Sequence, residues 1–269
     1  MEAKFESKLS NIDWYARFSG QRGIKMRTGI LYEDKELTVV YKPAGLAVQT
    51  AKIGQPDVVS ELKNYLSQSY LGVIHRLDQP VEGLLVFAKN KSAAAWLTGR
   101  LQAGGEGGAF HKRYYAVVCG KPSEKEGMFV DYLCKTQDNR AAILCPDHRR
   151  NPAGEKACRD VGQAKKAVLR YRTVQTTDAP APLTLAEIEI ETGRFHQIRA
   201  QMAYHGLPLL GDTKYGDEES VGLARELKVK NVSLCACALE FPHPETKEKM
   251  SFRIKPKGLG FSYFSQACF

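Results

Sequence analysis

The sequence contains no uninterrupted run of about eighteen apolar residues, the length that predicts a membrane-spanning helix. Its first ten residues, MEAKFESKLS, hold no apolar stretch either, so they do not have the pattern of a secretory signal. Neither an internal repeat nor a low-complexity tract is present. These absences favour a globular cytoplasmic protein without a membrane segment.

The seven cysteines lack the paired spacing of a metal site, because no two of them form a CxxC motif. In a chain without an export signal, an odd number of scattered cysteines favours reduced thiols, and zinc is not expected. The glycine-rich stretch at 104–108 does not fit GxGxxG, and no Walker motif occurs. We therefore expect no metal and no nucleotide cofactor.

The composition is that of an ordinary globular chain, with 43% hydrophobic and 26% charged residues. The length of 269 residues fits one large domain or two small ones. Lysine and arginine exceed the acidic residues, and the net charge of +9 favours a polyanionic partner. Segment 147–172 holds eight basic and three acidic residues, and is either a phosphate-backbone contact or an ordinary solvated loop.

Strand patterns outnumber helix patterns along the chain and are often consecutive, which predicts an α+β fold with a mixed, mostly antiparallel sheet. Helices are predicted over 57–69, 91–102 and 196–205. Strands are predicted over 38–42, 83–89, 113–120, 129–134, 141–145, 167–175, 183–192, 232–238 and 250–254.

The first segment with chemical potential is GVIHRLDQPVEGLLVFAK at 72–89, where charged residues lie between apolar ones. In an extended chain Arg76 and Asp78 project to the same side. A carboxylate beside a permanent cation stays ionised at neutral pH, and could act as a nucleophile or base. The alternative is a structural Arg76–Asp78 pair that fixes a loop.

The second segment is ETGRFHQIRAQMAYHG at 191–206, a strand-to-helix transition that carries Arg194, His196 and Arg199. His196 and Arg199 are three positions apart and share a helical face. An arginine near a helix start opposes the macrodipole, so an anion is expected beside it. A solvated basic turn is the alternative, and it is stronger for Arg194 than for Arg199.

The third segment is FHKRYYAVVCG at 110–120. Tyr114 and Tyr115 point to opposite faces of the predicted strand, so at most one of them can join a given site. A tyrosine facing a pocket could stack on a nucleobase. The alternative for each tyrosine is packing in the core.

Together these segments closely resemble the RluA-type RNA pseudouridine synthases. The matching stretches occur in the order and spacing of that family. They are LYEDKELTVVYKPAGLAVQT, VIHRLDQPVEGLLVFAKN, KRYYAVVCGKP, ETGRFHQIRAQMAYHGLPLLGDTKYG and, more weakly, SLCACALEFPHPETKEKMSF, which cover about residues 30–254.

The resemblance implies a catalytic domain over 29–269 with the pseudouridine synthase fold, in which a curved mixed sheet with flanking helices surrounds a central RNA-binding cleft. It implies isomerisation of uridine to pseudouridine in RNA, without cofactor or metal. Ribosomal RNA is expected ahead of transfer RNA, and the protein is expected to be a monomer. Residues 1–28 are expected to be an extension and not the S4-type module of many relatives.

The resemblance also assigns roles by position. Asp78 matches the catalytic aspartate, and Arg199 matches the arginine that pairs with it. Tyr114 matches the tyrosine that stacks on the target uracil, and Arg76 the arginine that helps hold the everted nucleotide. Leu234 falls near the pocket leucine of the family. Three further residues of these motifs are expected to contact RNA, namely His75, Arg194 and His196.

Two departures from the family pattern stand beside these matches. Val81 and Glu82 replace the Thr-Ser often found after the HRLD motif, and Glu82 is expected to bring a negative charge to an RNA-facing loop. Leu234-Cys235-Ala236 replaces the usual Leu-His-Ala. A non-catalytic RNA-binding protein on the same fold is the main alternative. A zinc deaminase is disfavoured because the sequence lacks the PCxxC ligand pair. A carbohydrate hydrolase is disfavoured because no second acid is well placed beside Asp78, and because it would not explain the arginines.

Overall fold

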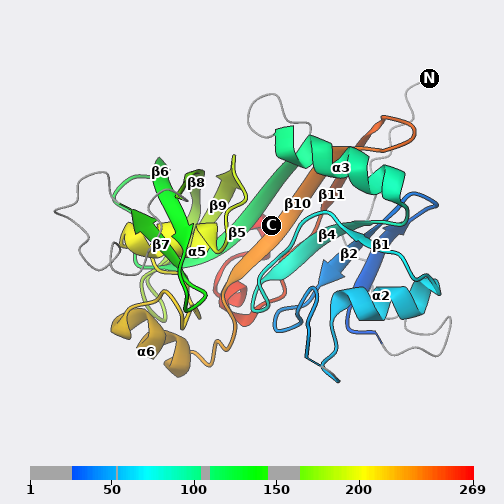
Figure 1. Ribbon diagram of the computed structural model, residues 1–269. Coiled ribbons are helices and arrows are strands. Elements are labelled where there is room, and N and C mark those ends of the chain that lie inside the picture. Colours follow the sequence, from blue (N-terminus) through cyan, green and yellow to red (C-terminus); the bar gives the residue numbers. More distant parts are fainter. Residues whose placement is uncertain (1–25, 53, 104–109, 145–163) are drawn as a thin grey trace.

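One mixed sheet organises the described part of the chain, as Figure 1 shows. The computed structural model describes residues 26–52, 54–103, 110–144 and 164–269. Its eleven strands, within those residues, are β1 (Gly29–Glu33), β2 (Leu37–Lys42), β3 (Gly72–Val73), β4 (Glu82–Ala88), β5 (His111–Cys119), β6 (Glu126–Lys135), β7 (Ala141–Leu144), β8 (Lys165–Thr177), β9 (Leu183–Ile190), β10 (Leu234–Pro242) and β11 (Lys249–Arg253). The helices are α2 (Val58–Leu66), α3 (Lys91–Ala103), α5 (Gln197–Tyr204) and α6 (Glu218–Glu226).

The strand order is β1-β2-β4-β10-β5-β9-β8-β6-β7, with β3 beside β4 and β11 beside β10. Among the described strands, β4 and β10 form the parallel pair, through the register Cys235↔Glu82 and Ala236↔Gly83. The other pairs are antiparallel. The prediction of a mixed, mostly antiparallel α+β sheet is therefore confirmed.

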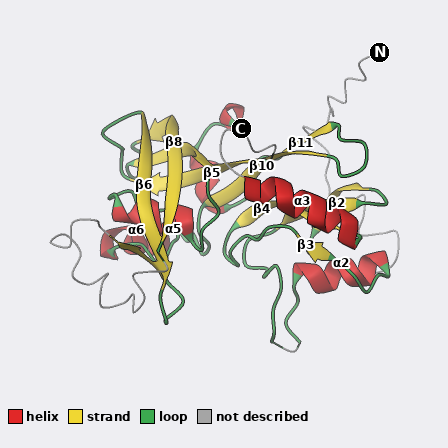
Figure 2. Cartoon of the chain, turned by 45° about the horizontal axis from the view of Figure 1, so that its top comes forward, coloured by secondary structure: helices red, strands yellow, loops and turns green. Residues whose placement is uncertain are grey.

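Helices cover parts of both faces of the sheet, so the core has two main layers (Figure 2). On one face, Leu62 of α2 and Met202 of α5 pack in the same cluster. On the other face, Leu97 of α3 and Ala224 of α6 pack in two separate clusters. Because β4 lies between these layers, every residue of it is buried, as its continuous apolar run predicts.

Two helices begin with the same kind of cap, although the sequence pattern predicted only one of them. Asp57 accepts a hydrogen bond from the Ser60 N–H at 2.8 Å and begins α2. Asp217 accepts from the Ser220 N–H, also at 2.8 Å, and begins α6 in the same way. The sequence pattern did not predict α6, because only small residues of it, Ser220 and Ala224, are buried. Leu223, the largest apolar side chain of α6, is only partly buried, so no stripe of large buried residues marks this helix.

Glu82 does not face RNA, and the expectation that it adds charge to an RNA-facing loop is wrong. Its side chain is buried in β4 and accepts hydrogen bonds from the Tyr41 hydroxyl at 2.6 Å and the Gly258 N–H at 2.8 Å. The next residue, Gly83, has φ of +134°, and a Cβ there would lie 2.5 Å from the Ala236 backbone nitrogen. Glycine at 83 thus permits the close approach of β4 and β10.

Four of the cysteines, Cys119, Cys235, Cys237 and Cys268, are free thiols as expected. Cys134 departs from the expectation, since it is disulfide-bonded. Most of the basic segment, 147–163, and most of the predicted extension, 1–25, lie outside the described residues. Within the described ranges, no helix is long and apolar enough to cross a membrane.

Candidate active site

A cleft of about 1240 Å³ opens between the segment after β3, the strands β5, β8 and β9, and the start of α5. This volume is above the range of about 300–1000 Å³ that is typical of small-molecule sites. The cleft is lined by every site residue that the sequence singled out. These are His75, Arg76, Asp78, Tyr114, Arg194, His196, Arg199 and Leu234.

At the cleft, a buried arginine joins two carboxylates. Arg199 Nη1 donates to Asp78 Oδ2 at 3.0 Å, while Nε and Nη2 donate to the two oxygens of Asp212 at 2.7 and 2.8 Å. The side chains of Arg199 and Asp212 are 6% and 1% exposed, whereas that of Asp78 is 25% exposed. Burial opposes the charge on Arg199, but Asp212 and Asp78 outweigh it and raise the pKa of the guanidinium.

The two carboxylates differ in what they can do. Asp212 also accepts hydrogen bonds from the backbone N–H groups of Lys214 and Tyr215, so its oxygens are fully engaged. Asp78 uses Oδ2 for Arg199, and no described residue donates a hydrogen bond to its Oδ1. Asp78 is therefore the carboxylate with an oxygen available to a molecule in the cleft, and Asp212 is the anchor that aims Arg199.

A ring nitrogen of His196 lies near Asp78, in addition to the guanidinium nitrogen of Arg199. Its backbone is left-handed, with φ of 53°, and its Nε2 lies 3.7 Å from Asp78 Oδ2. The Tyr215 oxygen accepts from the Ala141 N–H, which leaves the hydroxyl proton to donate to His196 Nδ1 at 2.7 Å. Burial lowers the pKa of His196 to about 4, despite the opposing charge of Asp78. A neutral His196 with its proton on Nε2 fits these contacts.

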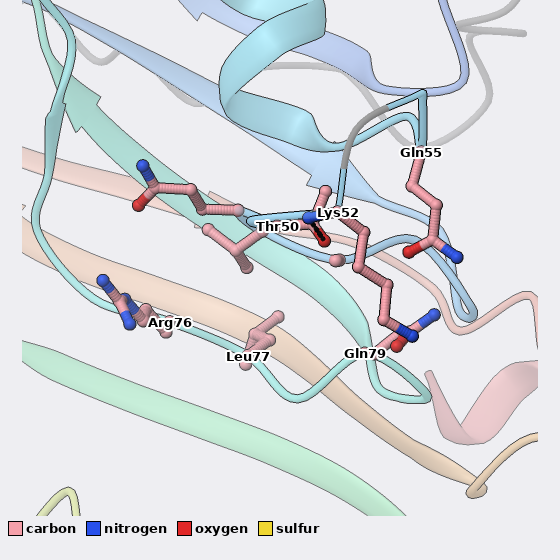
Figure 3. Close-up of a pocket in the computed structure, with 9 residues that line it drawn as sticks. Thr50, Lys52, Gln55, Arg76, Leu77 and Gln79 are labelled. Carbon is pink, nitrogen blue, oxygen red and sulfur yellow. Dashed lines mark hydrogen bonds between the residues drawn. The ribbon is translucent and has the colours of Figure 1, made fainter.

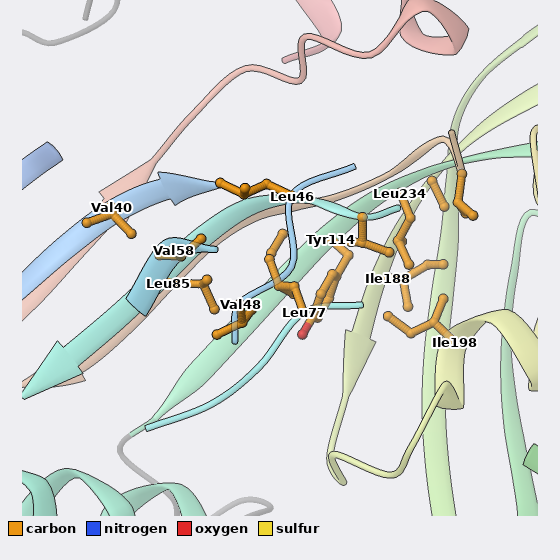
Figure 4. Packing of buried hydrophobic residues seen from close by; sticks show 14 of the residues in the cluster. Val40, Leu46, Val48, Val58, Leu77, Leu85, Tyr114, Ile188, Ile198 and Leu234 are labelled. Atoms are coloured by element: carbon orange, nitrogen blue, oxygen red, sulfur yellow. The ribbon is translucent and has the colours of Figure 1, made fainter. Parts of the chain in front are cut away.

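Tyr114 and Leu234 both line the cleft. They belong to the hydrophobic cluster drawn in Figure 4, which also contains Leu77, Ile188 and Ile198. Tyr114 is 5% exposed, and burial first and Asp78 second raise the pKa of its hydroxyl, which stays protonated at neutral pH. Tyr115 faces the opposite layer, as the strand pattern predicts. Tyr114 is thus a mostly buried residue of the cleft lining.

The remaining predicted residues differ in exposure. His75 is buried edge-on against Phe110, and neither of its ring nitrogens has a hydrogen-bond partner among the described residues. Burial lowers its pKa to about 3. Arg76 is exposed and forms no ion pair with Asp78 among the described contacts, so the alternative of a structural Arg76–Asp78 pair is wrong. Arg194 donates from Nε to the Lys166 carbonyl at 3.0 Å.

A buried lysine that the sequence analysis missed holds the backbone beside Asp78. The Nζ of Lys42 donates to the carbonyls of Pro43, Leu46 and Gln79 at 3.1, 2.8 and 3.1 Å. Lys42 is fully buried, and burial lowers its pKa to about 7. A lysine that ends an otherwise apolar strand and precedes Pro-Ala-Gly was the signal in the sequence for this role.

Replacing Lys42 with methionine is expected to lower the free energy of unfolding by about 3 kcal/mol, because buried carbonyls lose their donor. Turnover should also fall, since the Gln79 carbonyl adjoins Asp78. Urea denaturation followed by fluorescence measures the first effect. The surface variant Lys91→Met, at an exposed position of α3, is the matched control. Equal stability of the two variants would contradict the bracing role of Lys42.

With this geometry established, comparison with known proteins identifies the family. The family model described as RNA pseudouridylate synthase matches residues 36–204, more than half of the chain. The chain belongs to the RNA pseudouridine synthase family. It is therefore an isomerase of RNA modification, and the resemblance carried by the motifs is confirmed.

Among the described residues, no three His, Cys, Asp or Glu side chains gather as a metal site.

Curated members of this pseudouridine synthase family align over most of the chain. A tRNA pseudouridine synthase C of Haemophilus ducreyi is 30% identical over 229 residues, covering 84% of this chain and 90% of the relative. A ribosomal large subunit pseudouridine synthase D of Zymomonas mobilis is 31% identical over 237 residues, covering 83% and 67%. Relatives named for both RNA classes are thus similar to this chain.

Two solved structures share the fold of this synthase. Human RNA Pseudouridylate Synthase Domain Containing 1 superposes with a TM-score of 0.65 at 19% identity, covering 85% of this chain and 83% of that one. Human RNA Pseudouridylate Synthase Domain Containing 4 gives 0.64 at 22% identity, covering 87% and 92%. The predicted pseudouridine synthase fold is confirmed.

Proposed function

We propose that Asp78 is the catalytic carboxylate of this enzyme and acts on a uridine that has left its base stack. The observation that carries the proposal is the contact of Arg199 with one oxygen of Asp78, which leaves the other oxygen available in the cleft. A guanidinium at this distance orients the carboxylate through a charge-assisted hydrogen bond. The bond between N1 and C1′ breaks, the uracil turns, and a bond between C5 and C1′ forms.

The first step can take three forms with the same residue. Asp78 attacks the sugar at C1′, removes a proton from C2′, or attacks the ring at C6. In each form the overall reaction is an isomerisation that neither gains nor loses atoms. The uracil loses a proton from C5, which becomes bonded to C1′, and gains a proton at N1. The protonated hydroxyl of Tyr114 is not a base in its resting state, so its ring is assigned to stacking on the uracil.

Arg76 is proposed to compensate for the extrusion of the uridine. Taking a base out of its stack costs a few kcal/mol. Arg76 is exposed at the cleft and can fill the vacated space or grip a flanking phosphate. Arg194 and the sheet residues Lys166 and Arg170 line the same cleft and add positive charge for the RNA backbone. RNA contact by His75 and His196 stays a prediction.

Release of tritium from RNA that carries 5-tritiated uridine tests isomerisation directly, because the C5 hydrogen is lost only when the new bond forms. Release above the no-enzyme background is expected. RNA binding without release would instead support the alternative of a non-catalytic RNA-binding protein. The prediction that the substrate is ribosomal RNA and not transfer RNA is tested by mapping pseudouridines in both RNA classes from cells with and without the gene.

A further inference from the structure

A second, smaller pocket adjoins the cleft. It has a volume of about 280 Å³ and lies between the loop that follows β2 and the segment 76–79 (Figure 3). Lys52 and Gln55 come from the loop, and Arg76, Leu77 and Gln79 from the facing segment. This volume is near the lower end of the small-molecule range, so the pocket suits a single small planar group and not an RNA stem.

The pocket adjoins the cleft and shares two lining residues with it. Arg76 and Leu77 line both the pocket and the cleft, and they directly precede Asp78. Leu77 is 8% exposed and separates the two spaces, whereas Arg76 is exposed to both. A strand of RNA that places one nucleotide at Asp78 therefore brings a neighbouring nucleotide to this pocket.

The chemistry of the lining suits a nucleotide. Its polar side chains are three amides, one hydroxyl and two cations, with no carboxylate among them: Gln49, Gln55, Gln79, Thr50, Lys52 and Arg76. The Gln79 amide is held by its donation to the Gly45 carbonyl at 3.2 Å. The exposed amides of Gln49 and Gln55 make no hydrogen bond within the described residues. An amide offers both a donor and an acceptor to the edge of an unstacked base.

Resting on the proposed function, we infer that this pocket binds the base of a nucleotide adjacent to the target uridine, and that Gln49 and Gln55 read the edge of that base. Arg76 and Lys52 line the same pocket and supply positive charge for the phosphates that flank the base. The pocket is thus a specificity site, and it makes turnover depend on the identity of one neighbour of the target.

The test uses the full-length protein and a pool of stem-loop RNAs. Each RNA has one uridine in its loop and none elsewhere, and its two flanking positions are randomised among A, C and G. Pseudouridine is read at single positions by carbodiimide modification and primer extension. The wild-type enzyme is expected to favour one base at one flanking position by about tenfold, the discrimination of a good amide–base contact. In Gln49→Ala/Gln55→Ala this preference is expected to disappear.

The variant Gln68→Ala is the matched control, because Gln68 is an exposed glutamine beyond the end of α2 and outside the pocket. It should keep the wild-type preference. A wild-type enzyme without flanking preference, or a preference that the double variant keeps, would overturn the specificity site while leaving the proposed function intact.

Absence of pseudouridine with every RNA would instead count against the proposed function. In that case the binding of the same RNAs to Asp78→Asn protein, measured by fluorescence anisotropy, decides on the pocket. A flanking-base preference in affinity that Gln49→Ala/Gln55→Ala removes supports the pocket, and equal affinities overturn it.

Discussion

Asparagine in place of Asp78 is expected to lower pseudouridine formation by at least about a thousandfold, the scale of a lost acid–base or nucleophilic group. The substitution preserves volume and removes the anionic oxygen that faces the cleft. Arg199 keeps its two hydrogen bonds to Asp212, so the site should stay folded. Tritium release measures the reaction, and fluorescence anisotropy with the same RNA should show that binding is largely retained.

The exposed variant Asp178→Asn is the control for this experiment. Asp178 forms a surface ion pair with Lys121, and its side chain is 75% exposed. Such pairs contribute little to stability, so turnover should match that of the unmodified enzyme. Retained turnover in purified Asp78→Asn protein would remove Asp78 from the catalytic role.

Lysine in place of Arg199 is expected to lower kcat by about a hundredfold, although the positive charge is kept. The guanidinium reaches both oxygens of Asp212 and one oxygen of Asp78 at once, and an ammonium cannot reproduce this planar geometry. Asp78 should then lose its orientation while the cleft still admits RNA, so KM should change less than kcat. The free energy of unfolding is expected to fall by about 1–3 kcal/mol, because buried acceptors lose a donor.

Arg172→Lys is the matched control for Arg199→Lys. Arg172 pairs with Glu187 at 2.9 Å on the surface of β8, with a side chain that is 65% exposed. Its replacement should change stability by less than about 1 kcal/mol and leave kcat unaltered. If Arg199→Lys lost stability while the kcat of the folded protein stayed near that of the unmodified enzyme, Arg199 would be a structural residue only.

Local pattern explains how much of the fold could be predicted. The continuous apolar run of β4 predicts a buried strand, and the three-residue spacing of Val59 and Leu62 predicts the helix α2. Both elements lie close to the predicted positions. Partners across the sheet were not predictable, because pairing of β10 with β4 and β5 depends on contacts distant in sequence. The burial of Glu82 depends in the same way on Tyr41 and Gly258.

The candidate site was predictable to the extent that its residues stand in motifs. Asp78 and Arg199 were paired through the family resemblance, and the structure places them in contact. Asp212 was missed, although it stands in the quoted stretch GDTKYG, because an aspartate before a turn is usually only a cap. The role of Tyr215 in orienting His196 was equally hidden, since it arises from a contact across nineteen residues.

The close approach of β4 and β10 at Gly83 has a consequence for folding. Asp78 belongs to the segment that leads into β4, whereas Arg199 and Asp212 follow β9 on the far side of β10. The register between β4 and β10 consists of two residue pairs, which join these two parts of the sheet. Neither part alone contains the carboxylate together with its guanidinium. The enzyme therefore acquires its reactive centre only when the two parts have joined, and a chain in which they are apart lacks the paired carboxylate and guanidinium.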